Sequence, residues 1–253
     1  MKKASPRVAP LLGLLLLLCV DAGARAAELQ VLAGGALAAP LKELAARFEQ
    51  SSGHTVVIRY GTTPELIGLA TSGSPFDVGV FPRDVLKDAA ARAKFAAGAS
   101  TDIAHSGLAV AVRAGAPKPD ISTPEALKRT LLNAKSIATI PASATGTQLL
   151  AVFERLGIGD AIKPRIRAQS TPAQIVSTVA SGENELAVFL MNVVKAPGLD
   201  VVGPFPAPLQ QQVVFTAAVA TGAHQAEAAA AFIRFLVSPT AVAVLKSSGL
   251  DPG

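Results

Sequence analysis

The turn Gly61-Thr62-Thr63 places a glycine and two hydroxyl residues between a predicted strand, 56–60, and a predicted helix that begins at Pro64. A threonine at this point can cap the helix, whose first backbone N–H groups have no partner within the helix itself. Free N–H groups beside a hydroxyl form a natural binding site for an anion. The turn therefore predicts an anion site, and an ordinary capped strand-to-helix turn is the alternative.

A second turn, Ser143-Ala144-Thr145-Gly146-Thr147, has three hydroxyl residues around a glycine. It lies between a predicted strand, 136–139, and a predicted helix, 148–156, so it could form a cluster of N–H donors together with a cap. Two such helix starts on opposite halves of the molecule would close over one anion. This pairing predicts capture by hinge closure rather than chemistry.

Residues that would support catalysis are few. The three histidines, His54, His105 and His224, occur in unrelated contexts, and none stands at metal-ligand spacing from another. The sequence contains neither a G-x-S-x-G elbow nor a Walker loop. We therefore expect no catalytic residue, no metal and no cofactor.

An enzyme remains the rival hypothesis, because a cleft that binds carboxylates needs very few residues to transfer a proton. The reaction would be isomerisation or lysis of a small carboxylic acid. Its nearest candidate acid or base groups are Glu65, Asp84 and Tyr60. Their spacing in the sequence does not favour a catalytic role over a helix-capping or surface role.

The N-terminus has the pattern of a secretory signal peptide over residues 1–26. A basic leader precedes an apolar run of about 10 residues, which is too short to cross a bilayer, and Ala24-Arg25-Ala26 is a small-residue cleavage signal. Cleavage after Ala26 would remove Cys19, the only cysteine, and with it disulfides and thiolate sites. We expect a periplasmic protein whose fold depends on its hydrophobic core.

The charge balance argues against a nucleic-acid partner. The formal net charge is +5, but the leader carries four of the basic residues and one acidic residue, so the mature chain keeps only +2. One tyrosine, no tryptophan and no long basic run leave little for stacking on bases or contacting phosphates. We expect a small-molecule ligand and a monomer.

Strands and helices are predicted to alternate, which indicates an α/β protein with mostly parallel sheets covered on both faces. The predicted strands are 29–32, 56–60, 77–81, 108–112, 136–139, 185–190 and 213–219. The predicted helices are 37–50, 64–72, 85–94, 124–132, 148–156, 172–180, 225–237 and 240–248. Segments 114–119 and 197–208 are rich in proline and glycine, which places them at sheet edges or lobe boundaries.

Several segments resemble the periplasmic molybdate-binding proteins of ABC importers, within the type II periplasmic binding proteins. Residues 31–37 look like that family's opening strand and binding turn, and 61–63 like its second turn. Residues 73–78 resemble its G-x-P-x-D-[VL] segment, and 141–147 followed by 153–157 resemble a ligand-facing turn and the helix after it. The resemblance spans nearly the whole mature chain.

This resemblance implies two α/β lobes joined by a two-stranded hinge, with an oxyanion held in the cleft and an ABC permease in the inner membrane as partner. Lobe 1 is expected at 27–107 plus 216–253 and lobe 2 at 108–215, with the hinge crossings near 105–108 and 209–218. The ligand-binding positions that follow from the turns and the resemblance are Gly35, Ala36, Gly61, Thr62, Thr63, Ser143, Thr145, Gly146 and Thr147.

Three expected donors are missing compared with that family. The family's ligand-binding serine aligns with Ala36, and its ligand-binding tyrosine aligns with Leu190. A main-chain contact to the ligand aligns near Pro172. Each lost donor to a buried anion costs about 1.5 to 3 kcal/mol, so molybdate should bind weakly. We expect a small organic carboxylate in preference to a molybdate-like oxyanion, with Arg83 as the best-placed arginine, because it follows a strand's C-terminal end. Arg59 and Arg113 are the other candidates.

Overall fold

The computed structural model describes residues 26–253, so the predicted signal peptide lies almost entirely outside the described residues. Half of the molecule is built on a sheet in the order β2, β1, β3, β9, β4. β1 pairs in parallel with β2 and β3, and β9 lies antiparallel between β3 and β4. The bounds are β1 Glu28–Gly34, β2 Thr55–Gly61, β3 Val78–Pro82, β9 Gln212–Ala220 and β4 Phe95–Arg113.

The other half contains a second sheet, in which β7 (Leu186–Leu190) lies between β4 and β5 (Ile137–Thr139). β5 pairs in parallel with β6 (Ile166–Ala168), and β8 (Leu199–Pro204) pairs antiparallel with β4. β8 has no other partner among the described residues, so the proline-rich segment around it lies at a sheet edge, as predicted.

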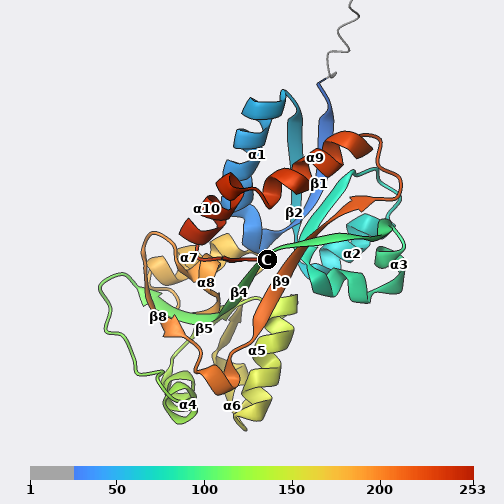
Figure 1. Ribbon diagram of the computed structural model, residues 1–253. Helices are drawn as coiled ribbons and strands as arrows, with labels where there is room; N and C mark the ends of the chain where they lie inside the picture. The colour runs from blue at the N-terminus through green and yellow to red at the C-terminus, as the bar shows by residue number, and fades with distance from the viewer. Residues whose placement is uncertain (1–25) are drawn as a thin grey trace, which may run out of the picture.

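Helices cover both faces of the two halves, which confirms the predicted α/β class with two lobes. Figure 1 shows α1, α9 and α10 on one side of the first sheet and α2 and α3 on the other. The longer helices are α1 Ala38–Ser52, α2 Thr63–Thr71, α4 Pro124–Asn133, α5 Ala144–Arg155, α7 Pro172–Ala180, α9 Ala226–Leu236 and α10 Pro239–Ser247. The short ones are η1 Gly35–Leu37, η2 Arg83–Lys87, α3 Ala89–Arg92, α6 Gly159–Ile162, η3 Lys163–Arg165, α8 Met191–Val194 and η4 Ala207–Leu209.

Two helix predictions were wrong in their bounds. The segment predicted as one helix over 85–94 forms η2 and α3, because Asp88 is extended between them and its carboxylate caps α3 by accepting from the Ala91 N–H. The helix predicted over 148–156 begins four residues earlier, at Ala144. Glycine and threonine are weak helix formers, so the sequence pattern did not indicate the first turn of this helix.

β4 is far longer than the predicted strand 108–112, and it runs through both halves (Figure 1). It pairs with β9 as far as Gly107, and with β7 and β8 from Leu108 onward. The Gln210 side chain holds β4 at the point where its partners change. Its Oε1 accepts from the Leu108 N–H at 2.8 Å, and its Nε2 donates to the Leu108 carbonyl at 3.0 Å. The change of partners supports the expected lobe boundary at 107/108, which stays a prediction, as do the hinge crossings.

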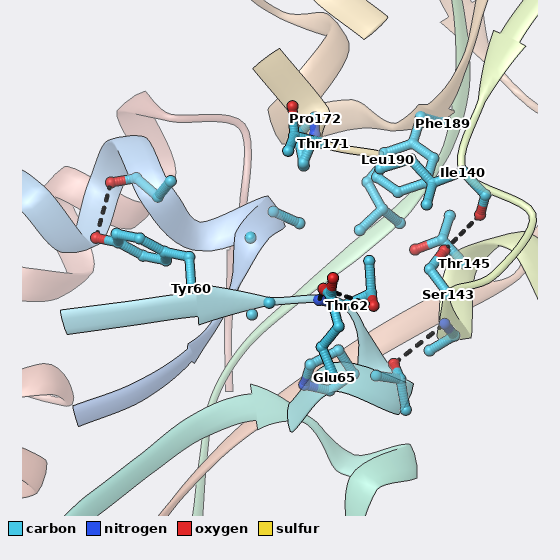
Figure 2. Close-up of a pocket in the computed structure, with 18 of the residues that line it drawn as sticks. Tyr60, Thr62, Glu65, Ile140, Ser143, Thr145, Thr171, Pro172, Phe189 and Leu190 are labelled. Carbon is cyan, nitrogen blue, oxygen red and sulfur yellow. Dashed lines mark hydrogen bonds between the residues drawn. The ribbon is translucent and has the colours of Figure 1, made fainter. Parts of the chain in front are cut away.

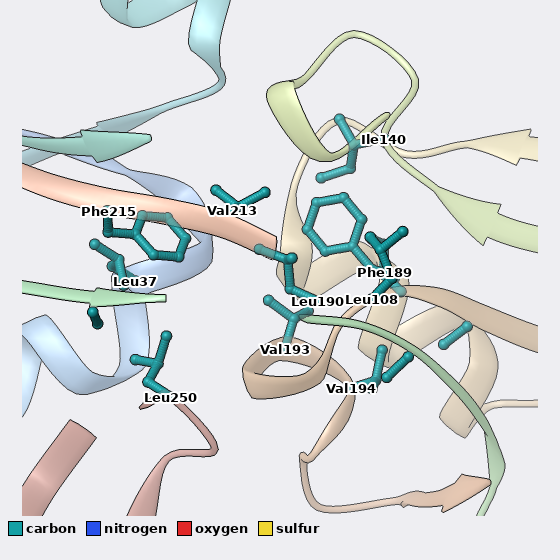
Figure 3. Packing of buried hydrophobic residues seen from close by; sticks show 14 of the residues in the cluster. Leu37, Leu108, Ile140, Phe189, Leu190, Val193, Val194, Val213, Phe215 and Leu250 are labelled. Atoms are coloured by element: carbon teal, nitrogen blue, oxygen red, sulfur yellow. The ribbon is translucent and has the colours of Figure 1, made fainter. Parts of the chain in front are cut away.

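The apolar core continues from one half of the molecule into the other. One cluster of buried residues extends from β1 and α1 in the first half to α5 and β7 in the second. Figure 3 shows Phe215 of β9 and Leu37 on one side, facing Leu190 and Phe189 of β7 on the other. A smaller cluster, with Phe76, Phe81 and Phe95, fills the space beneath α2. Among residues 26–253, no single helix has the length and apolarity to cross a membrane, although α9 and α10 pass that test as a pair bent by 59°.

Asp77 should be a strong contributor to stability. Only 4% of it is exposed, and its carboxylate accepts three backbone hydrogen bonds, from Gln30 (2.9 Å), His224 (2.8 Å) and Gln225 (3.0 Å). Asp77→Asn replaces one acceptor oxygen with a donor, so we expect the free energy of unfolding in urea to fall by about 2 kcal/mol. Asp88→Asn, at a half-buried helix cap where asparagine is equally favoured, should change it by less than about 0.5 kcal/mol. Equal effects of the two substitutions would contradict this assignment.

Candidate functional site

A cavity of about 400 Å³ lies between the two halves, where several helix starts meet (Figure 2). The first half contributes the ends of β1 and β2 with the turns that follow them. The second half contributes the starts of α5 and α7 and the end of β7. The residues around it are Gly34, Gly35, Ala36, Ala38, Tyr60, Gly61, Thr62, Thr63, Glu65, Pro82, Ile140, Ser143, Ala144, Thr145, Ser170, Thr171, Pro172, Ala173, Phe189, Leu190 and Phe215.

The start of α2 is closed by a capping box. The Thr62 side chain accepts from the Glu65 N–H, and Glu65 Oε2 accepts from the Thr62 N–H at 2.7 Å and from its hydroxyl at 2.8 Å. These hydrogen bonds from Thr62 lower the pKa of Glu65, which is therefore charged at neutral pH. Both donor groups of Thr62 are thus already in use, and the N–H and hydroxyl of Thr63 are the donors that α2 can offer to a ligand.

The start of α5 faces α2 across the cavity. Ser143 caps α5: its Oγ accepts from the Gly146 N–H at 3.0 Å and donates to the Ile140 carbonyl at 2.7 Å, so it has no proton left for a ligand. The Ala144 N–H donates to Thr63 Oγ1 at 3.2 Å, which brings the two helix starts into direct contact. Figure 2 shows this bond and the Ser143 bond at the edge of the cavity.

Thr145 is the polar side chain of the cavity that best suits contact with a ligand. It lies in the first turn of α5, and only 4% of the residue is exposed. Its backbone N–H is one of the helix-start groups that have no partner within the helix. The hydroxyl and the N–H of Thr145 therefore suit a ligand group inside the cavity.

The start of α7 is a third donor group, which sequence reasoning treated only as a lost contact. Thr171 and Gln174 form a capping box, and Pro172 at the first helical position has no N–H. Ala173, the next residue, lines the cavity with a free helix-start N–H. The pattern Thr-Pro-x-Gln over 171–174 is a capping-box signature that marks this helix start in the sequence, but it does not show that the start lies at the cavity.

The turn after β1 forms the floor of the cavity. The Asn192 side chain of α8 donates to the Ala36 carbonyl at 2.7 Å, a second direct contact between the halves. A Cβ on Gly35 would approach Pro172 Cδ to 3.4 Å, so the missing side chain lets these two segments lie close together. Ala36 brings no hydroxyl to this floor, in agreement with the sequence.

The remaining wall is apolar and carries no cation. Figure 2 shows Phe189 and Leu190 side by side above the helix starts, with Ile140 next to them. Pro82 and Phe215 complete this wall. Among the described residues 26–253, the lining contains no lysine, arginine or histidine, and its ionisable residues are Glu65 and Tyr60.

Seven of the ten predicted ligand positions meet at this cavity: Gly35, Ala36, Gly61, Thr62, Thr63, Ser143 and Thr145. Arg83 does not, because it is ion-paired with Asp102 outside the lining. Gly146 lies inside α5, and Thr147 faces a neighbouring hollow and donates its hydroxyl to the Ser143 carbonyl at 3.1 Å. That the seven bind a ligand stays a prediction.

The candidate acid and base groups are also separated by the fold. Tyr60 and Glu65 line the cavity, whereas Asp84 lines the neighbouring hollow and is ion-paired with Lys87. Burial raises the pKa of the Tyr60 phenol, which donates to the Ala38 carbonyl at 3.4 Å. Tyr60 therefore stays protonated at neutral pH, and Glu65, with its lowered pKa, is a weak proton acceptor.

The chain is similar to known proteins over most of its length. The model of the family described as bacterial extracellular solute-binding proteins matches residues 29–251. An aconitate isomerase of a Pseudomonas species is 33% identical over 232 residues, covering 88% of this chain and 87% of that protein. The molybdate-binding protein ModA of Azotobacter vinelandii is 29% identical over 252 residues, or 96% of each chain. The solved periplasmic molybdate-binding protein of Azotobacter vinelandii gives a TM-score of 0.71 at 23% identity, covering 88% of this chain and 98% of that one.

Proposed function

Because this chain belongs to the bacterial extracellular solute-binding proteins, we propose that it captures a small anion in the cavity between its lobes. The anion is a small organic carboxylate in preference to a molybdate-like oxyanion. The protein works in the periplasm and delivers the anion to an ABC permease of the inner membrane. The predicted signal peptide and the relatives named as periplasmic and molybdate-binding support this location and partner.

The observation that carries the proposal is that α2, α5 and α7 begin at one cavity. Each start has unpaired backbone N–H groups and the positive end of a helix dipole, and both favour a negative charge. The Thr145 side chain lies among them. Residues from both halves surround the cavity, so an anion bound there would favour the closed arrangement of the lobes.

A carboxylate suits the donors better than a tetrahedral oxyanion does. Ala36 and Leu190 have no hydroxyl, and Pro172 has no N–H, where the resemblance expects a donor, and Ser143 and Thr62 use their hydroxyls internally. The N–H and hydroxyl groups of Thr63 and Thr145 and the N–H of Ala173 remain, which gives each of two carboxylate oxygens at least two donors. Spread over four oxyanion oxygens, the same donors would give about one each, and each missing hydrogen bond costs about 1 to 3 kcal/mol.

Isomerisation of a small carboxylic acid is the second candidate function. One relative is named as an aconitate isomerase, and Tyr60 and Glu65 share the cavity with the helix starts. A proton-transfer reaction could use the Tyr60 phenol as acid. The pKa of Glu65, which its bonds from Thr62 hold low, makes this candidate less favoured than binding alone.

Thermal unfolding of the purified mature protein with a panel of anions tests the proposal. The panel contains molybdate, sulfate, acetate, isovalerate, succinate and trans-aconitate. A ligand present at 100 times its dissociation constant stabilises the folded state by about 2.7 kcal/mol, which raises the melting temperature of a protein of this size by about 5–10 °C. At least one carboxylate should give such a shift. A panel without any shift would reject anion capture, and catalytic turnover of trans-aconitate, followed by its change to the cis isomer, would favour the isomerase.

A further inference from the structure

The cavity lining has two chemically different parts. One part, the polar part, is made by the starts of α2, α5 and α7, with Thr145 among them. The other part, the apolar end of the cavity at β7 and β9, is made by Phe189, Leu190 and Phe215, which are at most 2% exposed. Figure 2 shows the Phe189 and Leu190 side chains facing the space above Thr62. A ligand that fills the cavity must therefore present an anionic group to the helix starts and apolar surface to these three side chains.

The charges around the cavity limit the ligand to one negative group. Within the part of the chain that the structure describes, no cationic side chain lines the cavity, and the charged side chain that does line it is the Glu65 carboxylate. A second carboxylate on the ligand would be removed from water without a cation to pair with, and Glu65 would repel it. Inorganic oxyanions avoid the second charge centre but leave the apolar end unfilled.

We propose that the ligand is a monocarboxylate with an uncharged, branched or cyclic apolar body, and that Leu190 and Phe189 select it. This inference rests on the proposed function and narrows its ligand class. The carboxylate binds the Thr63, Thr145 and Ala173 donors, and the apolar body packs against β7. Leu190 stands where the resemblance expects a tyrosine, so a polar contact to an oxyanion is exchanged for an apolar one.

A matched ligand series tests this proposal by calorimetry on the mature protein. Isovalerate and methylsuccinate differ by one methyl group replaced with a carboxylate, and isovaleramide is the neutral relative of isovalerate. We expect isovalerate to bind at least about tenfold more tightly than methylsuccinate, because of the unpaired second charge, and tenfold more tightly than isovaleramide. Acetate should bind about tenfold more weakly than isovalerate, because it buries fewer methyl groups.

Leu190→Ala tests the apolar end directly, with Leu190→Met as the matched control of similar volume. Leu190→Ala should weaken isovalerate binding about tenfold and leave acetate binding within twofold, because acetate does not reach β7. Leu190→Met should keep both affinities within a factor of about three. If Leu190→Ala fails to fold, the ligand series with the unaltered protein still decides the question.

The failure of this inference is distinguishable from the failure of anion capture. Tighter binding of methylsuccinate, trans-aconitate, molybdate or sulfate than of isovalerate would overturn the monocarboxylate assignment and leave anion capture standing. Equal losses for acetate and isovalerate in Leu190→Ala would overturn the role of Leu190. Binding of isovaleramide as tightly as isovalerate would overturn both, because the helix starts would then not be holding a charge.

Discussion

Thr145→Asp should abolish anion binding while the protein stays folded. We expect the affinity for the best ligand to fall at least about a hundredfold, which corresponds to about 2.7 kcal/mol. The new carboxylate would occupy the donors of α5 itself and repel any anion from a cavity without cations. Folding should persist, because an aspartate in the first turn of a helix is favoured by the helix dipole.

Thr145→Val is the matched comparison, since it removes the hydroxyl without adding a charge. It should reduce the affinity about tenfold, the value of one hydrogen bond to a charged group. Calorimetric titration of both variants and their melting temperatures without ligand would provide the test. An unchanged affinity in Thr145→Asp would mean that the ligand does not bind at the start of α5, and the proposed function would lose its main support.

Gly146→Ala should be among the most destabilising single substitutions in the protein. A Cβ at this position would lie 2.2 Å from the Ile140 carbonyl oxygen and 2.3 Å from the Pro141 carbonyl oxygen. These are backbone atoms that cannot rotate away, so the start of α5 must shift. We expect the free energy of unfolding to fall by about 3 kcal/mol or more, and the affinity for the ligand to fall with it.

Gly68→Ala is the control for this substitution. Gly68 also lies within a helix, α2, but a Cβ there has no neighbour within 4 Å. Alanine should therefore stabilise the helix by about 0.5–1 kcal/mol. Urea denaturation of the two variants measures both effects. Similar stability of Gly146→Ala and the unaltered protein would show that α5 does not begin against 140–141 as described.

The segments with strong local signals were predicted well. The helix over 172–180 has the predicted bounds, and α2 begins one residue before the predicted start, because Thr-Pro and Glu or Gln at the third helical position mark a helix start locally. The strands β1, β2, β3, β5, β7 and β9 differ from prediction by at most two residues at either end. The ends of helices and strands fray, so their boundaries vary by one or two residues with the criterion of assignment.

The segments without a local signal were predicted poorly. The first half of β4, 95–107, carries small and polar residues without alternation, and it becomes a strand only because β9 lies beside it. Arg83 follows a strand end, as a ligand-binding arginine would, but Asp102 of β4 pairs with it. The sequence contains both residues and gives no sign that they meet.

The sequence by itself determined the alternation of strands and helices, and with it the type of fold and the presence of capped helix starts that can hold an anion. Those properties depend on side-chain periodicity and on contacts within four residues. Only the tertiary structure decided that α7 shares the cavity with α2 and α5, and that Ser143 and Thr62 have already used their donors. Such choices depend on which segments approach one another after long-range pairing, and the partner of a hydrogen bond at that distance is not encoded in either segment alone.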